Sequence, residues 1–307
     1  MSDDFPNLLV VLGPTASGKT RVGVSLARAL GGEIVSADSR QVYRGLNIGA
    51  GKDLGEYSAG GAPVPYHLID IADLDEEFSV FHYQKRFFEV FEDLSQRHVL
   101  PILVGGTGLY IDAVLKGYRM VEAPEDPEFR ARCGGLTTTE LVERLRVLKP
   151  ELHNTTDMTD RTRIVRAIEI AEYSQTHEPE PAPDIRPVVL GLRWPREELH
   201  RRIRLRLKER LDNGLVEEVA SLHAQGVAWE KLDFLGLEYR FIASHLRGEM
   251  NRNDMAQRLA TAICQFAKRQ ETWFRRMERL GTPIHWIDRA SPDAAIEVAR
   301  SRFHLIS

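Results

Sequence analysis

The segment Gly13-Pro14-Thr15-Ala16-Ser17-Gly18-Lys19-Thr20 matches the phosphate-binding pattern G-x-x-x-x-G-K-S/T at every position and is the main sequence evidence for the fold. It stands between the apolar run 8–12, which is typical of a strand covered on both faces, and a helical pattern over 19–30. Glycines let backbone N–H groups turn toward phosphate oxygens, while the helix N-terminus and the lysine add positive charge. The motif therefore predicts a phosphate site without naming the phosphate compound. Its residues are Gly13, Thr15, Ala16, Ser17, Gly18, Lys19 and Thr20, and the Thr20 hydroxyl is expected to ligate Mg²⁺.

Three more apolar segments continue an alternation of strands and helices. Residues 33–37 end at Asp38, residues 99–104 end in Gly105-Gly106-Thr107-Gly108, and residues 188–192 follow a Pro-rich stretch. Such alternation indicates a parallel sheet, whose ligands bind beyond the carboxyl ends of the strands. We therefore predict an α/β protein with a P-loop NTPase-like parallel sheet and flanking helices.

The segment 116–185 differs in character from the rest of the chain. Pro-rich, acidic stretches border it, and it contains helical patterns over 139–148 and 161–173. Because it lies between two strands of one sheet, we interpret it as a helical insertion domain. The predicted core then consists of residues 1–115 and 186–307, and its C-terminal part carries long basic helices over 197–211 and about 255–279.

The composition suits a protein of the reducing cytoplasm. The chain has 307 residues and a formal net charge of −4, and no stretch approaches the ~20 apolar residues that span a bilayer. Its N-terminus is acidic, unlike a secretory signal, and its two cysteines lack metal-site spacing. Residues 1–185 carry 19 basic and 29 acidic side chains, whereas residues 186–307 carry 22 and 16. This asymmetry indicates an anionic partner for the C-terminal half, and no membrane partner is expected.

A small-molecule kinase or ATPase is one alternative. Such proteins place an Asp at a strand end to hold magnesium. The nearest candidate is Asp70 in His67-Leu68-Ile69-Asp70, but this run is short and follows two prolines, Pro63 and Pro65.

A second motif, Asp38-Ser39-Arg40-Gln41-Val42-Tyr43-Arg44, directly follows the second strand. Together with the phosphate-binding loop, it closely resembles the tRNA dimethylallyltransferases of the bacterial type. Further matches occur in the order of that family over roughly residues 8–276. They are Pro65-Tyr66-His67-Leu68-Ile69-Asp70, Gly105-Gly106-Thr107-Gly108-Leu109-Tyr110, Asp160 with Arg163-Ile164-Val165-Arg166-Ala167, and Lys268-Arg269-Gln270 with Thr272-Trp273-Phe274-Arg275.

The resemblance implies that the loop holds the diphosphate of dimethylallyl diphosphate rather than ATP. Breaking the carbon–oxygen bond leaves an allylic cation and diphosphate, so the enzyme must stabilise charge on the leaving group. Backbone amides of the loop, Lys19, Mg²⁺ and a C-terminal arginine are suited to this. The family pattern assigns that arginine to Arg206, with Arg202 as the second choice.

On the acceptor side, the resemblance implies that Asp38 accepts a proton from N6 of an adenosine at position 37, beside the anticodon of tRNA. Taken alone, Asp38 reads as a turn residue. Thr107 matches a family residue that helps to position the reacting groups. A base in a structured loop must be turned out before it reacts, so phosphate contacts to the anticodon loop are also expected. The residues implied are Asp38, Ser39, Arg40, Gln41, Arg130, Thr162, Arg163, Arg166, Lys268, Arg269, Gln270, Trp273 and Arg275.

Spacing supports the last group, since Lys268 and Arg275 are seven residues apart on one predicted helix. The alternative is an amphipathic helix with Trp273 in the core. The family pattern also differs at Gly236-Leu237-Glu238-Tyr239, where Gly-Tyr-Arg/Lys-Gln/Glu is usual. A prenyltransferase acting on free adenine nucleotides therefore remains as a second alternative. We expect the enzyme to act as a monomer.

Overall fold

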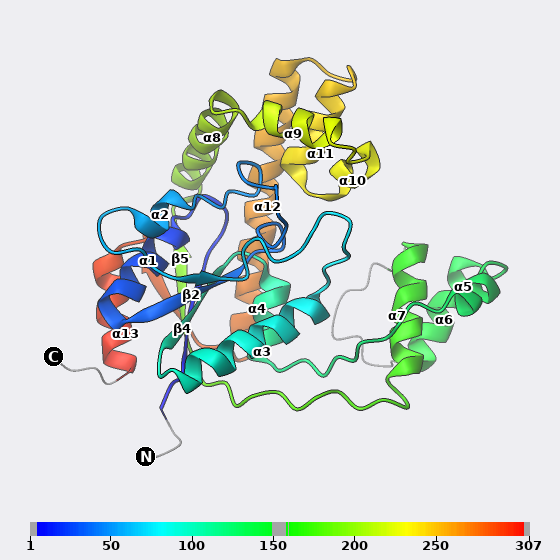
Figure 1. The fold of residues 1–307 in the computed structure, drawn as a ribbon, viewed down its shortest axis with the longest axis horizontal. Coiled ribbons are helices and arrows are strands. Elements are labelled where there is room, and N and C mark those ends of the chain that lie inside the picture. Colours follow the sequence, from blue (N-terminus) through cyan, green and yellow to red (C-terminus); the bar gives the residue numbers. More distant parts are fainter. Residues whose placement is uncertain (1–4, 149–157, 159, 304–307) are drawn as a thin grey trace. The chain divides into compact units, whose positions relative to one another are not determined.

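The computed structural model describes residues 5–148, 158 and 160–303, which form two compact units (Figure 1). One unit comprises Met1–Lys116 with Asp184–Ser307, and the other comprises Gly117–Pro183. Among the described residues, no helix combines the length and the apolar character that crossing a membrane requires.

The larger unit is built on a parallel sheet in the order β3-β2-β4-β1-β5-β6. Its strands are β1 (Leu8–Leu12), β2 (Gly32–Ala37), β3 (Tyr66–His67), β4 (Leu100–Gly105), β5 (Pro187–Arg193) and β6 (Ile284–Asp288). All paired neighbours run parallel, and Leu9 of the central β1 lies opposite both Ile102 and Val188. The predicted α/β fold and its four predicted strands are confirmed, whereas β3 and β6 were not predicted.

Helices cover both faces of this sheet (Figure 1). Because side chains alternate along β1, Leu9 and Val11 face one layer while Leu8, Val10 and Leu12 face the other. The first layer contains α1 (Lys19–Leu30) and α13 (Pro292–Arg302), and the second contains α3 (Val80–Gln96), α4 (Gly108–Leu115) and the C-terminal part of α12 (Arg252–Arg279). The short helix α2 is Gly55–Ser58.

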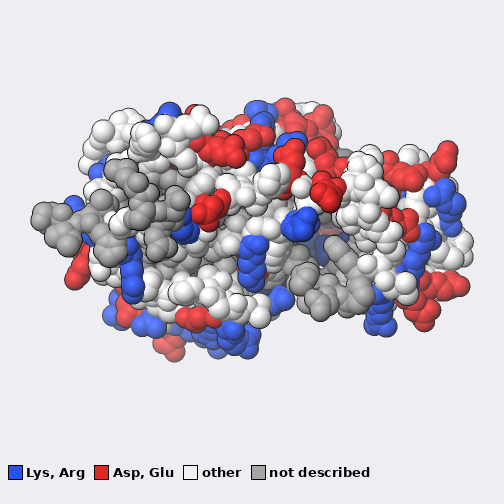
Figure 2. All heavy atoms as spheres, turned by 90° about the horizontal axis from the view of Figure 1, so that it is seen from below, with Lys and Arg blue, Asp and Glu red and all other residues white. Residues whose placement is uncertain are grey.

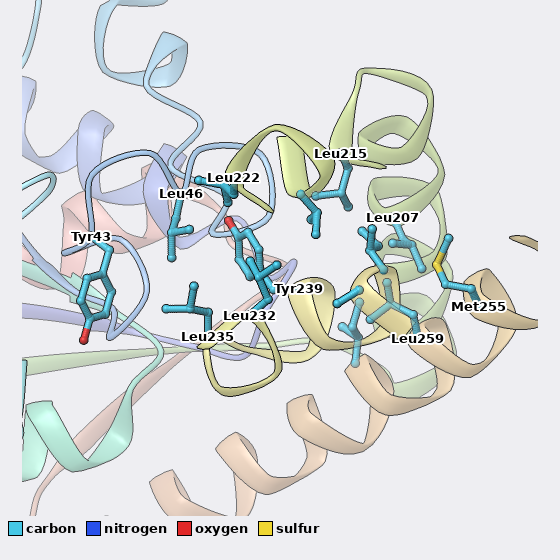
Figure 3. Close-up of a cluster of buried hydrophobic side chains, with 14 of the residues drawn as sticks. Tyr43, Leu46, Leu207, Leu215, Leu222, Leu232, Leu235, Tyr239, Met255 and Leu259 are labelled. Carbon is cyan, nitrogen blue, oxygen red and sulfur yellow. The ribbon is translucent and has the colours of Figure 1, made fainter. Parts of the chain in front are cut away.

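A third core joins the segment after β2 to the C-terminal helices. These helices are α8 (Arg196–Asp212), α9 (Leu215–Ala224), α10 (Trp229–Phe234), α11 (Leu237–Leu246) and the N-terminal part of α12. Figure 3 shows Tyr43 and Leu46 from the segment after β2 beside Leu222, Leu235 and Tyr239 from the helices. This packing holds the loop that carries Asp38 against the basic C-terminal half.

The smaller unit is helical, with α5 (Pro127–Cys133), α6 (Thr138–Leu148) and α7 (Arg161–Tyr173). Its own core contains Phe129, Cys133, Leu141, Leu145, Ile164 and Ile168. Asp126 and Asp160 begin two of the helices, each accepting a hydrogen bond from the backbone N–H three residues on.

Candidate active site

The phosphate-binding loop is held in place by three C-terminal side chains. Trp194 Nε1 donates to the Ser17 carbonyl at 2.9 Å, and Arg202 Nε donates to the Ala16 carbonyl at 2.8 Å. Gln270 Oε1 accepts from the Thr15 backbone N–H, also at 2.8 Å. Gly18, with φ of 87°, adopts the left-handed conformation that favours glycine and begins α1. The loop is therefore ordered by contacts from β5–α8 and α12.

A pocket of about 1060 Å³ opens beside this loop. It brings together most of the residues predicted for the donor and the reacting adenosine. Predicted residues on its lining are Thr15, Ala16, Gly18, Lys19, Thr20, Asp38, Ser39, Arg40, Gln41, Thr107, Arg202, Arg206, Arg269 and Gln270. Gly13 and Ser17 are buried within the loop instead.

Lys19 lies at the wall of the pocket, with Nζ 3.4 Å from the Pro14 carbonyl oxygen. Burial lowers the pKa of its amine from 10.5 to about 8, against the raising effect of the Asp38 charge. The positive charges of Arg206 and Arg210 lower this pKa further. The site therefore concentrates positive charge where an anion is needed to balance it.

Three arginines of α8, spaced four residues apart, line one side of the pocket. Arg202 stacks its guanidinium over the Trp194 ring at 4.3 Å while bonding to the loop, and Arg206 forms an ion pair with Asp53. Arg210 Nη2 is buried without a hydrogen-bond partner in the described part of the chain, and burial lowers the pKa of this arginine. The sequence prediction missed Arg210, although its position one turn beyond Arg206 was a usable signal.

Asp38 and Thr107 come from the loops after neighbouring strands β2 and β4. The Thr107 hydroxyl accepts from the Ser39 backbone N–H at 3.1 Å, and the Thr107 N–H donates to the Ala37 carbonyl at 3.1 Å. One Asp38 oxygen accepts from the Arg40 backbone N–H at 2.9 Å. The two loops are thus fastened together, and both side chains face the same pocket.

The loop 47–52 forms another wall of the pocket and is held by α9 and α11. The Glu218 carboxylate accepts three backbone N–H groups from residues 47–49, at 2.7–3.1 Å, and the Tyr239 hydroxyl at 2.9 Å. Tyr239 is buried, and Glu238, which lies on the pocket lining, has its pKa raised by burial. The chain differs from the family pattern at residues 236–239. Two of these residues, Glu238 and Tyr239, therefore form or support this wall of the pocket.

Gln270 and Trp273 of α12, which are expected to contact RNA, also make contacts within the protein; Gln270 is buried and Trp273 is half-buried. The buried Gln270 side chain accepts from Thr15 and donates to the Gly106 carbonyl at 2.9 Å, so it links the phosphate-binding loop to the loop after β4. Trp273 packs against Gly108, where an added Cβ would come within 2.3 Å of its ring. Lys268, Arg269 and Arg275 on the same helix are exposed.

In the smaller unit, two of the predicted RNA contacts already have protein partners. Arg130 and Arg166 both pair with Glu169, whose side chain is only 2% exposed, and Arg166 also donates to the Ala123 carbonyl at 2.7 Å. Thr162 and Arg163 are exposed at the beginning of α7. Arg130 and Arg166 therefore stabilise the unit, and both side chains stay partly exposed.

The residues at the loop fit Mg²⁺ bound together with a diphosphate. Mg²⁺ is usually held by one or two protein oxygens with phosphate and water oxygens completing its shell. Thr20 lies on the pocket lining, so its hydroxyl is available as a protein ligand to the ion. In the described residues, no group of three His, Cys, Asp or Glu side chains is arranged to hold a metal.

Asp70, the carboxylate that a kinase mechanism would need, has another partner. It forms an ion pair with Lys52, whose buried amine also donates to the Tyr43 carbonyl at 2.9 Å. The pocket lining, taken over the described residues, includes Lys52 but not Asp70.

Comparison with known proteins agrees with this arrangement. A family model described as IPP transferase matches residues 41–277, and one described as Isopentenyl transferase matches residues 6–60. The chain is similar to tRNA dimethylallyltransferase 2 of Trichlorobacter lovleyi, with 58% identity over 94% of each chain. It is 60% identical to tRNA dimethylallyltransferase 2 of Syntrophotalea carbinolica, over 92% of this chain and 95% of the relative. Among solved structures, the tRNA isopentenylpyrophosphate transferase of Bacillus halodurans is similar, with a TM-score of 0.71, 30% identity and 97% of each chain covered. The chain therefore belongs to the IPP transferase family, that of the tRNA dimethylallyltransferases.

Proposed function

We propose that this enzyme transfers a dimethylallyl group from dimethylallyl diphosphate to N6 of the adenosine at position 37 of tRNA, releasing diphosphate. The observation that carries the proposal is that one pocket is lined both by residues assigned to the donor and by residues assigned to the acceptor. The phosphate-binding loop and the α8 arginines line it together with Asp38 and Thr107. The names of the similar proteins support tRNA as the acceptor.

For the donor, we assign the diphosphate to the loop amides, Lys19 and the arginines of α8. Lys19 and Arg206 are placed to stabilise the negative charge that develops as the carbon–oxygen bond breaks. Mg²⁺ held through Thr20 would offset part of the same charge when bound. Leu205 and Ile263 on the lining offer apolar contact to the five-carbon chain.

For the acceptor, we assign proton removal to Asp38. The N6 amine is a weak nucleophile because its lone pair is delocalised into the adenine ring. As the N6–carbon bond forms, a proton leaves the nitrogen for the Asp38 carboxylate, so no positive charge remains on the base. Thr107, fastened to Ser39, holds the geometry of this loop.

The proposal is tested by offering tRNA and AMP to the enzyme at equal concentration with dimethylallyl diphosphate and Mg²⁺. Prenylation of tRNA alone supports the proposal. Prenylation of AMP with unmodified tRNA would contradict it in favour of the free-nucleotide alternative. We further propose that the enzyme acts in the cytoplasm, where tRNA is available, as a monomer.

A further inference from the structure

Two phenylalanines on the lining of the active-site pocket remain in contact with solvent. Phe234, the last residue of α10, is 62% exposed, and Phe266 of α12 is 39% exposed. Neither donor chemistry nor proton transfer uses these rings. Large apolar rings that are open to solvent beside a binding pocket are candidates for contact with a ligand.

Each ring is paired with an arginine that also lines the pocket. The Arg40 guanidinium carbon lies 5.7 Å from the centre of the Phe234 ring, and that of Arg269 lies 5.7 Å from the centre of the Phe266 ring. Both distances fall within the range of a cation–π contact. Gly236, with φ of 139°, adopts a backbone conformation that favours glycine and lies beside the Arg40 side chain.

The chemistry of such a pair matches an unpaired nucleotide. The flat face of any nucleobase stacks on an aromatic ring, and the neighbouring phosphate attracts a guanidinium. A free phosphate would use the charge but not the ring. Dimethylallyl diphosphate would use both, but its diphosphate is assigned to the phosphate-binding loop and the arginines of α8.

The position of Arg40 indicates which nucleotide is involved. Its backbone N–H donates to Asp38 at 2.9 Å, so the Phe234–Arg40 pair begins two residues from the carboxylate assigned to the acceptor amine. A base that stacks on Phe234 would therefore belong to the same RNA strand as the reacting adenosine and lie next to it.

We propose that the Phe234–Arg40 and Phe266–Arg269 pairs are stacking platforms for unpaired bases of the anticodon loop, and that Phe234 takes a base adjacent to the reacting adenosine. This inference rests on the proposed function. The two platforms hold the loop open around the target, because a base stacked on protein is no longer stacked on its neighbour.

The test uses the full-length enzyme and anticodon stem-loop RNAs that carry 2-aminopurine, whose fluorescence falls on stacking, at position 36 or 38. With the wild-type enzyme, one of the two probes should change fluorescence on binding. Phe234→Ala should abolish that change and weaken RNA binding by about 5- to 150-fold, the range measured for loss of base–aromatic stacking. Phe234→Tyr should restore both.

The salt dependence of binding separates stacking from a charge contact. Because Phe234→Ala removes no charge, the slope of log affinity against log salt should stay at the wild-type value. Leu280→Ala serves as the matched control, since Leu280 is 58% exposed but lies at the end of α12, away from the pocket lining. Phe266→Ala should weaken RNA binding in the same way.

Three results would overturn the inference. They are unchanged RNA affinity in both Phe→Ala variants, an equal loss in Leu280→Ala, and a loss of donor affinity that exceeds the loss of RNA affinity. The last would assign the rings to the prenyl chain. If the wild-type enzyme neither binds nor modifies the stem-loop, the proposed function itself is wrong. If the wild-type enzyme modifies the stem-loop but one of the three results above is found, only the stacking inference is wrong.

Discussion

Lys19 is a single residue that serves ligand binding and lowers the folding stability of the ligand-free protein. Its amine lies at the pocket wall, where burial lowers its pKa to about 8 from 10.5. The unfolded chain therefore holds this proton more tightly than the folded chain does. Consequently, the cost to folding stability is fully present below about pH 8 and is relieved as the pH rises toward 10.5.

Lys19→Met should accordingly stabilise the ligand-free enzyme at pH 7 while weakening binding of a non-ionising diphosphate analogue. Because the amine faces an open pocket, we expect a gain of between about 1 and 3 kcal/mol in the free energy of unfolding. Denaturant unfolding of both proteins at pH 7 and pH 9.5 measures it, and the difference should shrink at the higher pH. A less stable variant at pH 7, or unchanged analogue affinity, would contradict this account of the loop.

Asp38→Asn should fold normally and bind the donor, yet lose turnover by about 10²-fold or more, the usual scale of a general base. Asparagine can still accept the Arg40 backbone hydrogen bond but cannot take a proton from N6. Single-turnover rates with saturating tRNA provide the measurement. Rates near those of the wild type would make Asp38 a structural turn residue.

Three elements were predicted from the sequence with the bounds that they have in the structure. β1, α1 and α7 begin and end where their patterns do. β3 has only two residues, and β6 alternates imperfectly in burial, so neither produces a clear local signal. Gln270 stands beside Lys268 and Arg269 in the sequence, which made it read as an RNA contact. Its burial depends on the fold, which brings α12 against two loops more than 160 residues away.

Gln270→Ala should weaken donor binding, because the phosphate-binding loop and the loop after β4 lose the side chain that links them. Leaving the Thr15 N–H without a partner should also cost about 1–3 kcal/mol in the free energy of unfolding. Gln257→Ala, an exposed position on the same helix, is the control. Calorimetry with the diphosphate analogue and denaturant unfolding measure both effects. Equal behaviour of the two variants would remove Gln270 from the description of the site.

The exposed basic residues of α12 should act on tRNA rather than on the donor. Single alanine substitutions of Lys268, Arg269 and Arg275 should each flatten the slope of log affinity against log salt, by about 0.7 unit for a single-stranded contact. Arg252→Ala is the control, since Arg252 is exposed at the start of α12, about 24 Å along the helix from Lys268. Filter binding over a salt series measures the slope for each of the three variants and for the control. An unchanged slope in all three variants would mean that these three side chains contact solvent and not the phosphates of tRNA.

At the scale of the whole molecule, net charge alone gives little indication of an RNA substrate. The net charge is −4, and on the face drawn in Figure 2 acidic and basic side chains are interspersed. The excess of basic residues after 185 predicted an anionic partner, and α8 places three of those arginines on the donor pocket. The helical unit Gly117–Pro183 has its own core. That the segment 116–185 is an insertion domain for tRNA stays a prediction. Its contact with RNA remains a proposal, because two of its predicted arginines already pair with Glu169.

We expect one pocket to bind both an allylic diphosphate and the adenosine of tRNA that receives its prenyl group. The most direct test of this expectation is mass spectrometry of nucleosides from tRNA incubated with dimethylallyl diphosphate and Mg²⁺, using wild-type enzyme and Asp38→Asn in parallel. We expect an adenosine carrying one added dimethylallyl group with the wild type, and almost none with the variant in the same time. Unmodified tRNA after wild-type treatment, under conditions in which free AMP is prenylated or the donor is left intact, would contradict this expectation.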